Sequence, residues 1–553
     1  MGSKHQSLYR FHFLGDMLKM VYICGRKMNS TMMRKLFLTL VLVSWAFVCG
    51  MAQKSTVQKM MDESRNNPKA EYFLDILTGR FGGRLIGSDA FENAQQWMAR
   101  EFKKWGVEVR LEEVGELPFG FNRGPWFGRA IGAEEFGLRD LHFVTPSYTS
   151  GTHGIQMGHV VLEPKTEQEL EKMKGTLKGA WVLISGTSNG MAISRSPKIE
   201  QIRNNIKAEN KEIAERNAQK RREAYQNGTS YVPEEIHEYP ALFYKEMVEA
   251  GVLGFIQSSK VPLTALYDRD MIDEKLVTDF DSLPTIPDIK LDEYQYDIIK
   301  KLAQERRRFW LEFDIRNHFK LGPVKYHNLV AEIKGTKYPD EYVIACGHLD
   351  AYDAGTGAVD CGTGITPLLE MARLLAVSGA KPKRTIRFVA TAAEEFGIWG
   401  ADGYCLKHSK ELDKICCVFN RDYGIEPPVG VSVPDCMYDD FVKVSQPLVE
   451  TSTDQWPFAV SRGKAQRKPT RLQSSDYSAF AMRGVPTVDF TCKDVYGLNF
   501  TYGEIWHTER DILNKQNGDY MQRTALVTAI ELLGIANLDH QLSRQGFFEG
   551  ESK

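Results

Sequence analysis

Short apolar runs alternate with stretches of helical periodicity along the second half of the chain. The runs have the length of buried strands and lie at 329–333, 342–346, 385–390, 416–420 and 486–490. Apolar side chains with helical spacing cover 366–377 and 520–538. This alternation is typical of a mostly parallel sheet covered by helices, because parallel strands need crossover connections. We therefore predict an α/β domain with a mostly parallel mixed sheet over 324–545, followed by a tail at 546–553.

The segment 53–115 has mainly helical character. Ser88 is a good helix N-cap, and apolar residues from Phe91 to Trp105 then recur on one helical face. Gly106 follows the last of them and is a typical helix terminator. We expect this helix to pack on the core of the α/β domain, and we assign it no chemistry.

The middle of the chain, 116–323, has a different pattern. Short apolar runs such as 181–184 and 253–256 predict strands rather than long helices. Between them lies a charged stretch poor in apolar residues, 199–223, in which basic and acidic side chains are interleaved. We predict a solvated helix there that bridges two parts of a small, β-rich domain.

The N-terminus has the features of a targeting signal. Arg34 and Lys35 precede the apolar run 36–48, and small residues follow it, which is the order of a secretory signal peptide. The run is short for a membrane span. We assign 1–52 to a leader and signal peptide and expect export to the periplasm or the extracellular space. A lipoprotein anchor at Cys49 is an alternative that the residues before it disfavour.

The composition is that of a soluble globular protein with more than one domain. The chain has 553 residues, 42% hydrophobic and 26% charged, which is long for one ordinary core. The formal net charge of -2 gives no strong field that would favour nucleic acid or an anionic membrane. Nine cysteines occur without CxxC spacing, and Cys24 and Cys49 lie in the leader. We expect buried thiols rather than a disulfide framework.

Residues that can bind metal follow the run 342–346. His348 and Asp350 come directly after it, and Asp360 lies in a glycine-rich loop over 355–362. Open α/β sheets carry their active sites beyond the carboxyl ends of strands. A single histidine there is more often structural, and Asp360 alone could cap the helix that follows. However, an aspartate two residues after a histidine can accept the second ring N–H and fix the tautomer.

More carboxylates and a second imidazole follow later strands. Glu394 and Glu395 come after the run 385–390, Asp422 follows the next run, and His507 lies in a loop. An imidazole at each end of the series, with carboxylates between, is a donor set suited to a pair of divalent metal ions. Because neighbouring side chains point differently, one glutamate can bind metal while the other accepts a proton from the attacking water.

From 328 to about 539 the sequence resembles the catalytic domain of the co-catalytic zinc peptidases of family M28. The resemblance rests on HLD at 348–350, the loop of Asp360, TAAEE ending at Glu395, RD ending at Asp422, and HT at 507–508 with Asp511. Secondary matches are RLIGS at 84–88 and the stretch 475–486. Carboxypeptidase Q-like and bacterial aminopeptidase-like members are the most similar, and 116–323 resembles the protease-associated insert that many members carry.

The resemblance implies a ligand set for two zinc ions. His348, Asp360 and Asp422 would hold one, and Asp360, Glu395 and His507 would hold the other. The mixed nitrogen and oxygen donors favour zinc, and Co²⁺ or Mn²⁺ could substitute for it.

The resemblance also implies roles for neighbouring residues. Glu394 would be the general base and then the proton donor, and Asp350 would support His348. The sequence departs from the family at Cys361, where Asp or Asn is usual, and at Tyr477, where His is frequent. A thiol at 361 could change the hydrogen bonds around the metals or the metal preference. Aromatic candidates for the substrate pocket are Tyr352, Tyr477, Tyr496, Tyr502 and Trp506.

These expectations define an exported di-zinc exopeptidase that hydrolyses dipeptides or the terminal residue of short peptides. The end of the peptide that is bound stays open, as does the role of the insert, which could cover the cleft or mediate homodimerisation. One alternative is a glutaminyl cyclase-like acyltransferase with a single zinc, which the retained His348 and Asp422 disfavour. Another is a catalytically inactive receptor or binding protein, which would be expected to lack ligands that are present here.

Overall fold

The computed structural model describes residues 54–193, 197–267, 280–422 and 424–550. The predicted leader and signal peptide at 1–52, with Cys24 and Cys49, lies outside the described residues, as do 551–553 of the predicted tail. The chain divides into a short unit, Met1–Lys59, and a large unit, Met60–Lys553. In the described ranges, no helix combines the length and the apolar character needed to cross a bilayer.

A five-stranded mixed sheet organises the core of the large unit, with the strand order β1-β9-β11-β10-β12. Its strands are β1 (Glu108–Asn122), β9 (His318–Ile333), β10 (Tyr338–His348), β11 (Arg384–Thr391) and β12 (Ile415–Asn420). β10 pairs in parallel with β11 and β12, whereas β9 pairs antiparallel with β1 and β11. The predicted α/β fold is confirmed, and its parallel part is the three strands that end at the candidate site.

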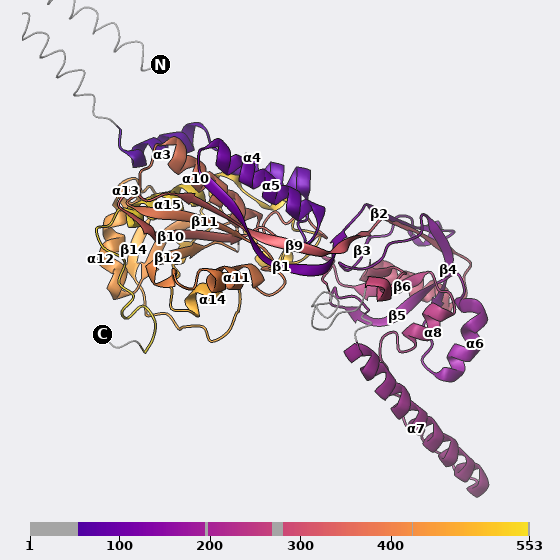
Figure 1. The fold of residues 1–553 in the computed structure, drawn as a ribbon. Coiled ribbons are helices and arrows are strands. Elements are labelled where there is room, and N and C mark those ends of the chain that lie inside the picture. Colours follow the sequence, from indigo (N-terminus) through magenta and orange to yellow (C-terminus); the bar gives the residue numbers. More distant parts are fainter. Residues whose placement is uncertain (1–53, 194–196, 268–279, 423, 551–553) are drawn as a thin grey trace, which may run out of the picture. The chain divides into compact units, whose positions relative to one another are not determined.

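Helices cover both faces of this sheet (Figure 1). One face carries α4 (Ala70–Ile76), α5 (Asp89–Lys104), α10 (Gly362–Val377) and α15 (Gly518–Ala536), and the other carries α11 (Trp399–Lys407) and α14 (Tyr477–Ala481). Almost every residue of α10 is buried, because α10 lies between the sheet and the helices α4 and α15. The predicted cap of α5 is present, since the Ser88 side chain accepts a hydrogen bond from the Phe91 N–H.

Between β1 and β9 in the chain lies a second sheet, of seven strands. This sheet, together with the helices and loops that connect its strands, is called the insert. Its order is β2-β8-β4-β5-β6-β7-β3. The strands are β2 (Trp126–Ile131), β3 (Phe143–Val144), β4 (Gln156–Leu162), β5 (Ala180–Ser188), β6 (Gly254–Ser259), β7 (Asp288–Asp292) and β8 (Trp310–Ile315). Its helices are α6 (Glu167–Leu177), α8 (Tyr244–Glu249) and α9 (Glu293–Gln304). The ends of the predicted domain 116–323 therefore belong to β1 and β9 of the five-stranded sheet.

Aromatic packing forms the core of the insert. The rings of Trp181 and Phe313 meet edge to face with centroids 4.8 Å apart, and the Trp181 indole N–H donates to the Leu311 carbonyl at 3.1 Å. Trp181 is fully buried, so its polar atom needs this partner. The strands predicted at 181–184 and 253–256 correspond to β5 and β6.

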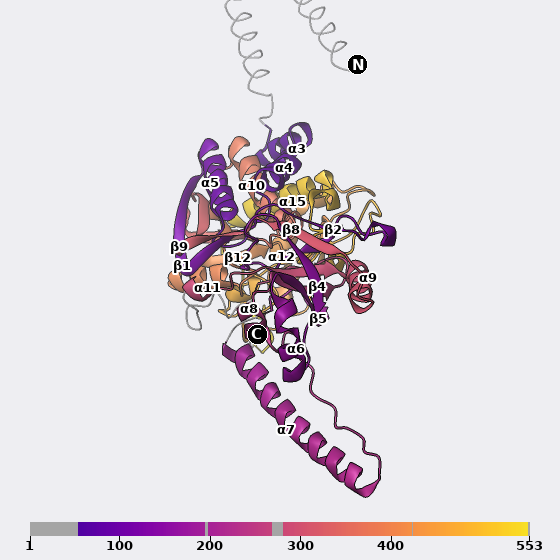
Figure 2. The same cartoon turned by 90° about the vertical axis from the view of Figure 1, so that its right-hand side faces the viewer.

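The charged stretch of the insert is helical, as predicted, and forms α7 (Pro197–Asn227). Its start packs on the insert, where Arg203 lies over the Tyr244 ring. Further along, the Asn217 side chain exchanges two hydrogen bonds with the main chain of Glu234, and Asn210 does the same with His237. The helix therefore does not bridge two parts of the insert. It pairs with the extended segment that follows it in the chain and contains Glu234 and His237, which runs beside it in Figure 2.

The last predicted strand is shifted. Residues 486–489 lie outside the named strands, with an isolated bridge from Thr487 to Val418, and β15 (Phe490–Cys492) begins at the last predicted residue. β15 belongs to a small sheet with β13 (Pro428–Val433) and β14 (Ala459–Arg462), flanked by α12 (Asp435–Val444) and α13 (Gln446–Glu450). The observed strand lies further along the chain than the predicted one because β13 pairs with the residues of β15.

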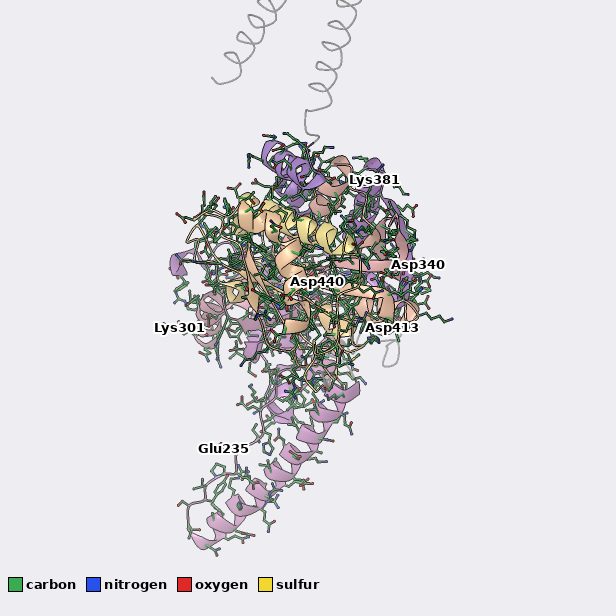
Figure 3. The ribbon with its side chains drawn as sticks, turned by 90° about the vertical axis from the view of Figure 1, so that its left-hand side faces the viewer. Glu235, Lys301, Asp340, Lys381, Asp413 and Asp440 are labelled. Carbon is green, nitrogen blue, oxygen red and sulfur yellow. The ribbon has the colours of Figure 1, made fainter. Side chains whose placement is uncertain are left out.

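Polar and sulfur-containing side chains are distributed as the composition predicts. Exposed charged residues such as Lys301, Lys381 and Asp413 lie on the outside of the molecule (Figure 3). Most cysteines of the described ranges are buried thiols, as expected: Cys346, Cys361, Cys405, Cys416 and Cys417.

Candidate metal centre

The predicted metal ligands lie at the carboxyl edge of the parallel strands. His348 is the last residue of β10, and Glu394 and Asp422 follow the ends of β11 and β12. Asp360 lies two residues before the start of α10, and His507 follows the short helix η7 (Tyr502–Glu504). Because β10, β11 and β12 are parallel neighbours, the loops after them meet at one edge of the sheet.

The Asp360 carboxylate lies between the two imidazoles. Its Oδ1 is 3.3 Å from His348 Nε2, and its Oδ2 is 3.6 Å from His507 Nε2. Asp422 Oδ1 is 2.8 Å from His348 Nε2, and Glu395 Oε2 is 2.9 Å from His507 Nε2. The structure therefore brings all of the predicted ligands together, with one carboxylate shared by two groups of donors.

The donors fit divalent cations in charge as well as in type. Glu395 Oε1 is buried without a hydrogen-bond partner, although buried polar atoms are nearly always paired. Burial, together with the nearby Asp360 carboxylate, raises the pKa of Glu395 well above its ordinary value. Burial also lowers the pKa of His507, which favours the neutral imidazole that metal ligation needs. Cations would neutralise this crowded negative charge.

Asp350 differs from its predicted role. The His348 Nδ1–H donates to the main-chain carbonyl of Asp350 at 2.9 Å, whereas the Asp350 carboxylate is 3.7 Å from Nδ1. The carboxylate instead accepts the main-chain N–H groups of Glu394 and Glu395, each at 3.2 Å. Asp350 therefore supports the turn that carries both glutamates, in which Ala393 has a φ of 56°.

Arg84 and Asp511 hold the loops that carry His348 and Asp360. The buried Arg84 guanidinium donates to the carbonyls of Leu349, Thr356 and Gly357. A Cβ at Gly357, whose φ is 60°, would lie 2.2 Å from the Ala351 Cβ, so only glycine fits there.

Asp511 orients Asp360 through the main chain. Its carboxylate accepts the N–H groups of Val359, at 2.6 Å, and of Asp360, at 3.2 Å. Burial raises the pKa of Asp511 to about 7.

The Cys361 thiol is part of the same cluster. Its Sγ, a His348 ring nitrogen and an Asp422 oxygen lie within 4.8 Å of one another. The thiol donates to the Arg421 carbonyl at 3.2 Å, and burial raises the pKa of Cys361 to about 12. The side chain is thus a neutral donor that links two ligand loops.

Residues 328–531, which carry all of these ligands, match the model of Peptidase family M28. This domain belongs to peptidase family M28. Carboxypeptidase Q from Mus musculus is 26% identical over 326 residues, which are 56% of this chain and 64% of that protein. The probable leucine aminopeptidase 2 of Aspergillus oryzae is 27% identical over 245 residues, 43% of each chain. This chain therefore spans less than two thirds of the carboxypeptidase Q that it matches.

A solved structure shares the fold of the M28 domain and much of the remaining chain. The crystal structure of a Peptidase M28 precursor from Shewanella amazonensis SB2B has a TM-score of 0.52 and is 20% identical. The likeness covers 88% of this chain and 97% of that chain.

A cavity of about 560 Å³ opens beside the ligands of the M28 domain. Three of the predicted pocket aromatics line it: Tyr477, Tyr502 and Trp506. Tyr352 is not among the lining residues, and its ring centroid lies 4.3 Å from that of His507. Tyr496 is not at the cavity, because its hydroxyl donates to Asp519 at 3.1 Å and its ring packs on Trp456.

Several residues at the M28 site were missed from the sequence. Asn420, Ser475 and Asp489 line the cavity, and the Tyr267 hydroxyl of the insert donates to the Glu395 carbonyl at 3.0 Å. Asp489 is an acid inside the predicted apolar run 486–490, a signal that could have drawn attention to it. Tyr267 carries no comparable signal, because its position depends on how the insert packs.

Proposed function

We propose that this protein is an exported metallo-exopeptidase that uses two zinc ions to hydrolyse dipeptides or the terminal residue of short peptides. The observation that carries the proposal is the Asp360 carboxylate between two imidazoles, each with a further carboxylate within 3 Å. Its place in an M28 domain supports it, as do relatives named carboxypeptidase Q and leucine aminopeptidase.

Each cation would have its own ligands and share one. His348 and Asp422 would hold the first, His507 and Glu395 the second, and Asp360 both. Zinc ions bound there would polarise the scissile carbonyl and make the attacking water more acidic.

Glu394 is the residue placed to move protons. It lines the cavity beside Glu395 and Asp422, and Asp350 fixes its main chain. Burial raises the pKa of Glu394 to about 11 in the bare cluster, and neighbouring cations would favour its ionised form. It can then accept the proton of the attacking water and return it to the leaving amine.

Tyr502 can act as a donor to the oxygen on which negative charge develops. Its side chain lines the cavity, with the hydroxyl 3.5 Å from the Asp422 carbonyl. Burial raises the pKa of Tyr502 well above its ordinary value, so the hydroxyl keeps its proton. A fixed donor of this kind stabilises the charge of the tetrahedral transition state.

The cavity favours the amino end of a peptide. No lysine or arginine occurs among the described residues that line it, whereas Asp489 adds an acid beyond those assigned to metal binding and proton transfer. Asn420 Oδ1, in the same wall, is buried without a hydrogen-bond partner. An α-ammonium group would find acceptors there, and an α-carboxylate would find none of the basic partners that it needs.

A dipeptide panel with metal analysis tests the function. The purified protein is assayed with free dipeptides and with N-acetylated and C-amidated versions, and zinc per chain is measured. We expect hydrolysis of free and C-amidated substrates, none of N-acetylated ones, and two zinc ions. Glu394→Gln should lose hydrolysis and keep both ions, while Glu235→Gln, at an exposed position, serves as the control. A Glu394→Gln variant with normal turnover would refute the base assignment, and a single zinc would favour the acyltransferase alternative.

A further inference from the structure

A segment of the insert, residues 263–267, lies against the loop that carries His507 and is called the insert strap. Thr264 forms an antiparallel bridge with Thr508. The Glu509 N–H donates to the Leu263 carbonyl at 2.9 Å, and the Glu509 side chain accepts the Leu263 N–H at 3.1 Å. The insert strap therefore binds the main chain directly after a proposed metal ligand.

The last residue of the insert strap, Tyr267, reaches a second ligand loop. Its hydroxyl donates to the main-chain carbonyl of Glu395 at 3.0 Å. Its ring stacks on Phe396, with centroids 4.0 Å apart and planes 12° apart. On the other side it stacks on Tyr352 at 6.0 Å, and Tyr352 in turn packs against the His507 ring at 4.3 Å. Tyr267 thus contacts the Glu395 loop directly and the His507 ring through Tyr352.

The insert strap is anchored in the insert itself. The Leu266 N–H donates to the Gly190 carbonyl, and its carbonyl accepts the Ser147 N–H, each at 2.9 Å. Leu263 and Ala265 are fully buried and pack with Val144 of β3. A contact made by Tyr267 is therefore held by the fold of the insert and is not a loose surface contact.

The other group of ligands is held by residues outside the insert. Arg84 holds the main chain after His348, Asp511 binds the N–H of Asp360, and the Cys361 thiol binds the carbonyl before Asp422. Of the ligands, those that the insert strap supports are Glu395 and His507, which belong to the same proposed cation. The insert also reaches the loop between His348 and Asp360, where the Ser147 hydroxyl donates to Asp353 at 2.6 Å. The insert strap itself contacts Glu395 and the loop after His507, whose ligands belong to one of the two sites.

We propose that the insert is a working part of the second metal site, in which Tyr267 is a positioning residue that sets how Glu395 and His507 face each other. The proposal rests on the di-metal site of the proposed function. Metal ligands must be held closely in their binding geometry, and loss of a group that orients them typically costs about 10–100-fold in affinity. The second site should therefore lose affinity when the contact is removed, while the first keeps its own.

Zinc binding by the full-length protein tests this directly. Zinc is titrated against a chromogenic chelator, which gives an affinity for each site without any assay of hydrolysis. Tyr267→Phe removes only the hydroxyl, and Tyr267→Ala also removes the stacked ring. The control is Tyr294→Ala, a residue of α9 in the insert that is 70% exposed. We expect a several-fold weakening of one site in Tyr267→Phe and about ten-fold or more in Tyr267→Ala, with the other site and the control unchanged.

A double variant identifies which of the two zinc sites is affected. His507→Ala removes a ligand of the second site, so adding Tyr267→Ala to it should leave the remaining affinity unchanged. If Tyr267→Ala weakens both sites equally, or neither, the proposal is wrong. If Tyr267→Ala fails to fold, Tyr267→Phe carries the same test, and unchanged zinc affinities in it would overturn the proposal. A wild-type protein that binds two zinc ions and hydrolyses no peptide would contradict the proposed function and leave this inference standing.

Discussion

His348 and His507 face opposite oxygens of one carboxylate, that of Asp360, at 3.3 Å and 3.6 Å. The two imidazoles come from distant parts of the chain, and the carboxylate between them is nearly fully buried. Such an arrangement has a direct consequence for metal binding. A change at the shared residue should affect both cations, whereas a change at an unshared ligand should affect one.

Substitution of Asp360, which the two proposed sites share, is therefore expected to differ in its effect on zinc binding from substitution of a carboxylate that belongs to one site only. Asp360→Asn removes the charge that the two proposed sites share, so both zinc ions are expected to bind about 100-fold or more weakly. Asp422→Asn should weaken only the site that contains His348. Zinc per chain after dialysis at fixed free zinc distinguishes the two variants. Equal losses in both would contradict the assignment of Asp360 as the bridge.

Asp350 should act on catalysis through the turn that carries the glutamates. Asp350→Ala leaves the N–H groups of Glu394 and Glu395 without their acceptor, and each unpaired buried N–H costs about 1–3 kcal/mol. We expect a lower free energy of unfolding and a kcat reduced by about 10–100-fold, with zinc retained at saturating metal. Asp413→Asn, at an exposed position, is the control. An unchanged kcat would show that this turn does not depend on Asp350.

Asp489 should determine whether a free amino group is required. Asp489 is the acid lining the cavity to which we assign no metal or proton-transfer role. Asp489→Asn should therefore raise KM for free dipeptides about ten-fold while kcat changes little, as expected for a charged hydrogen bond worth about 1.5 kcal/mol or more. The same substitution should leave KM for N-acetylated substrates unchanged. Equal effects on KM for both substrate classes would contradict binding of the ammonium group.

A buried acid away from the site predicts how stability depends on pH. Burial raises the pKa of Glu531 to about 8, and its Oε2 has no hydrogen-bond partner. The folded state therefore prefers the protonated acid. Its contribution to stability is complete below the unfolded pKa, about 4.3, and is lost as pH rises towards about 8. Glu531→Gln should remove this loss, so its Tm relative to wild type should increase from pH 5 to pH 8. A constant difference in Tm would refute the raised pKa.

The ligands could be found from the sequence because they follow strands. His348, Glu395 and Asp422 each come after an apolar run, and the parallel pairing of β10, β11 and β12 places the ends of those runs together. The local sequence pattern is enough to find these ligands, because residues that follow neighbouring parallel strands meet at the same edge of the sheet. His507 lies in a loop, and its place beside Asp360 could be expected only from the family resemblance.

Other features depend on contacts between distant segments. The pairing of β1 with β9 crosses the whole insert, so no local pattern reveals where the insert begins and ends. The sequence places Asp350 next to His348 but does not tell which oxygen the ring contacts; the main-chain carbonyl does so because the carboxylate is engaged by the turn after β11. Tyr496 resembled a pocket residue, yet its hydroxyl binds Asp519.

Zinc-dependent recovery of hydrolysis tests the central claim most directly. The protein is stripped of metal, zinc is added back in measured equivalents, and hydrolysis of a free dipeptide is followed at each step. We predict that activity reaches its plateau at two equivalents per chain, and that Asp360→Asn shows no recovery over the same range. A plateau at one equivalent, or full activity in the stripped protein, would contradict the account of two cations joined by Asp360.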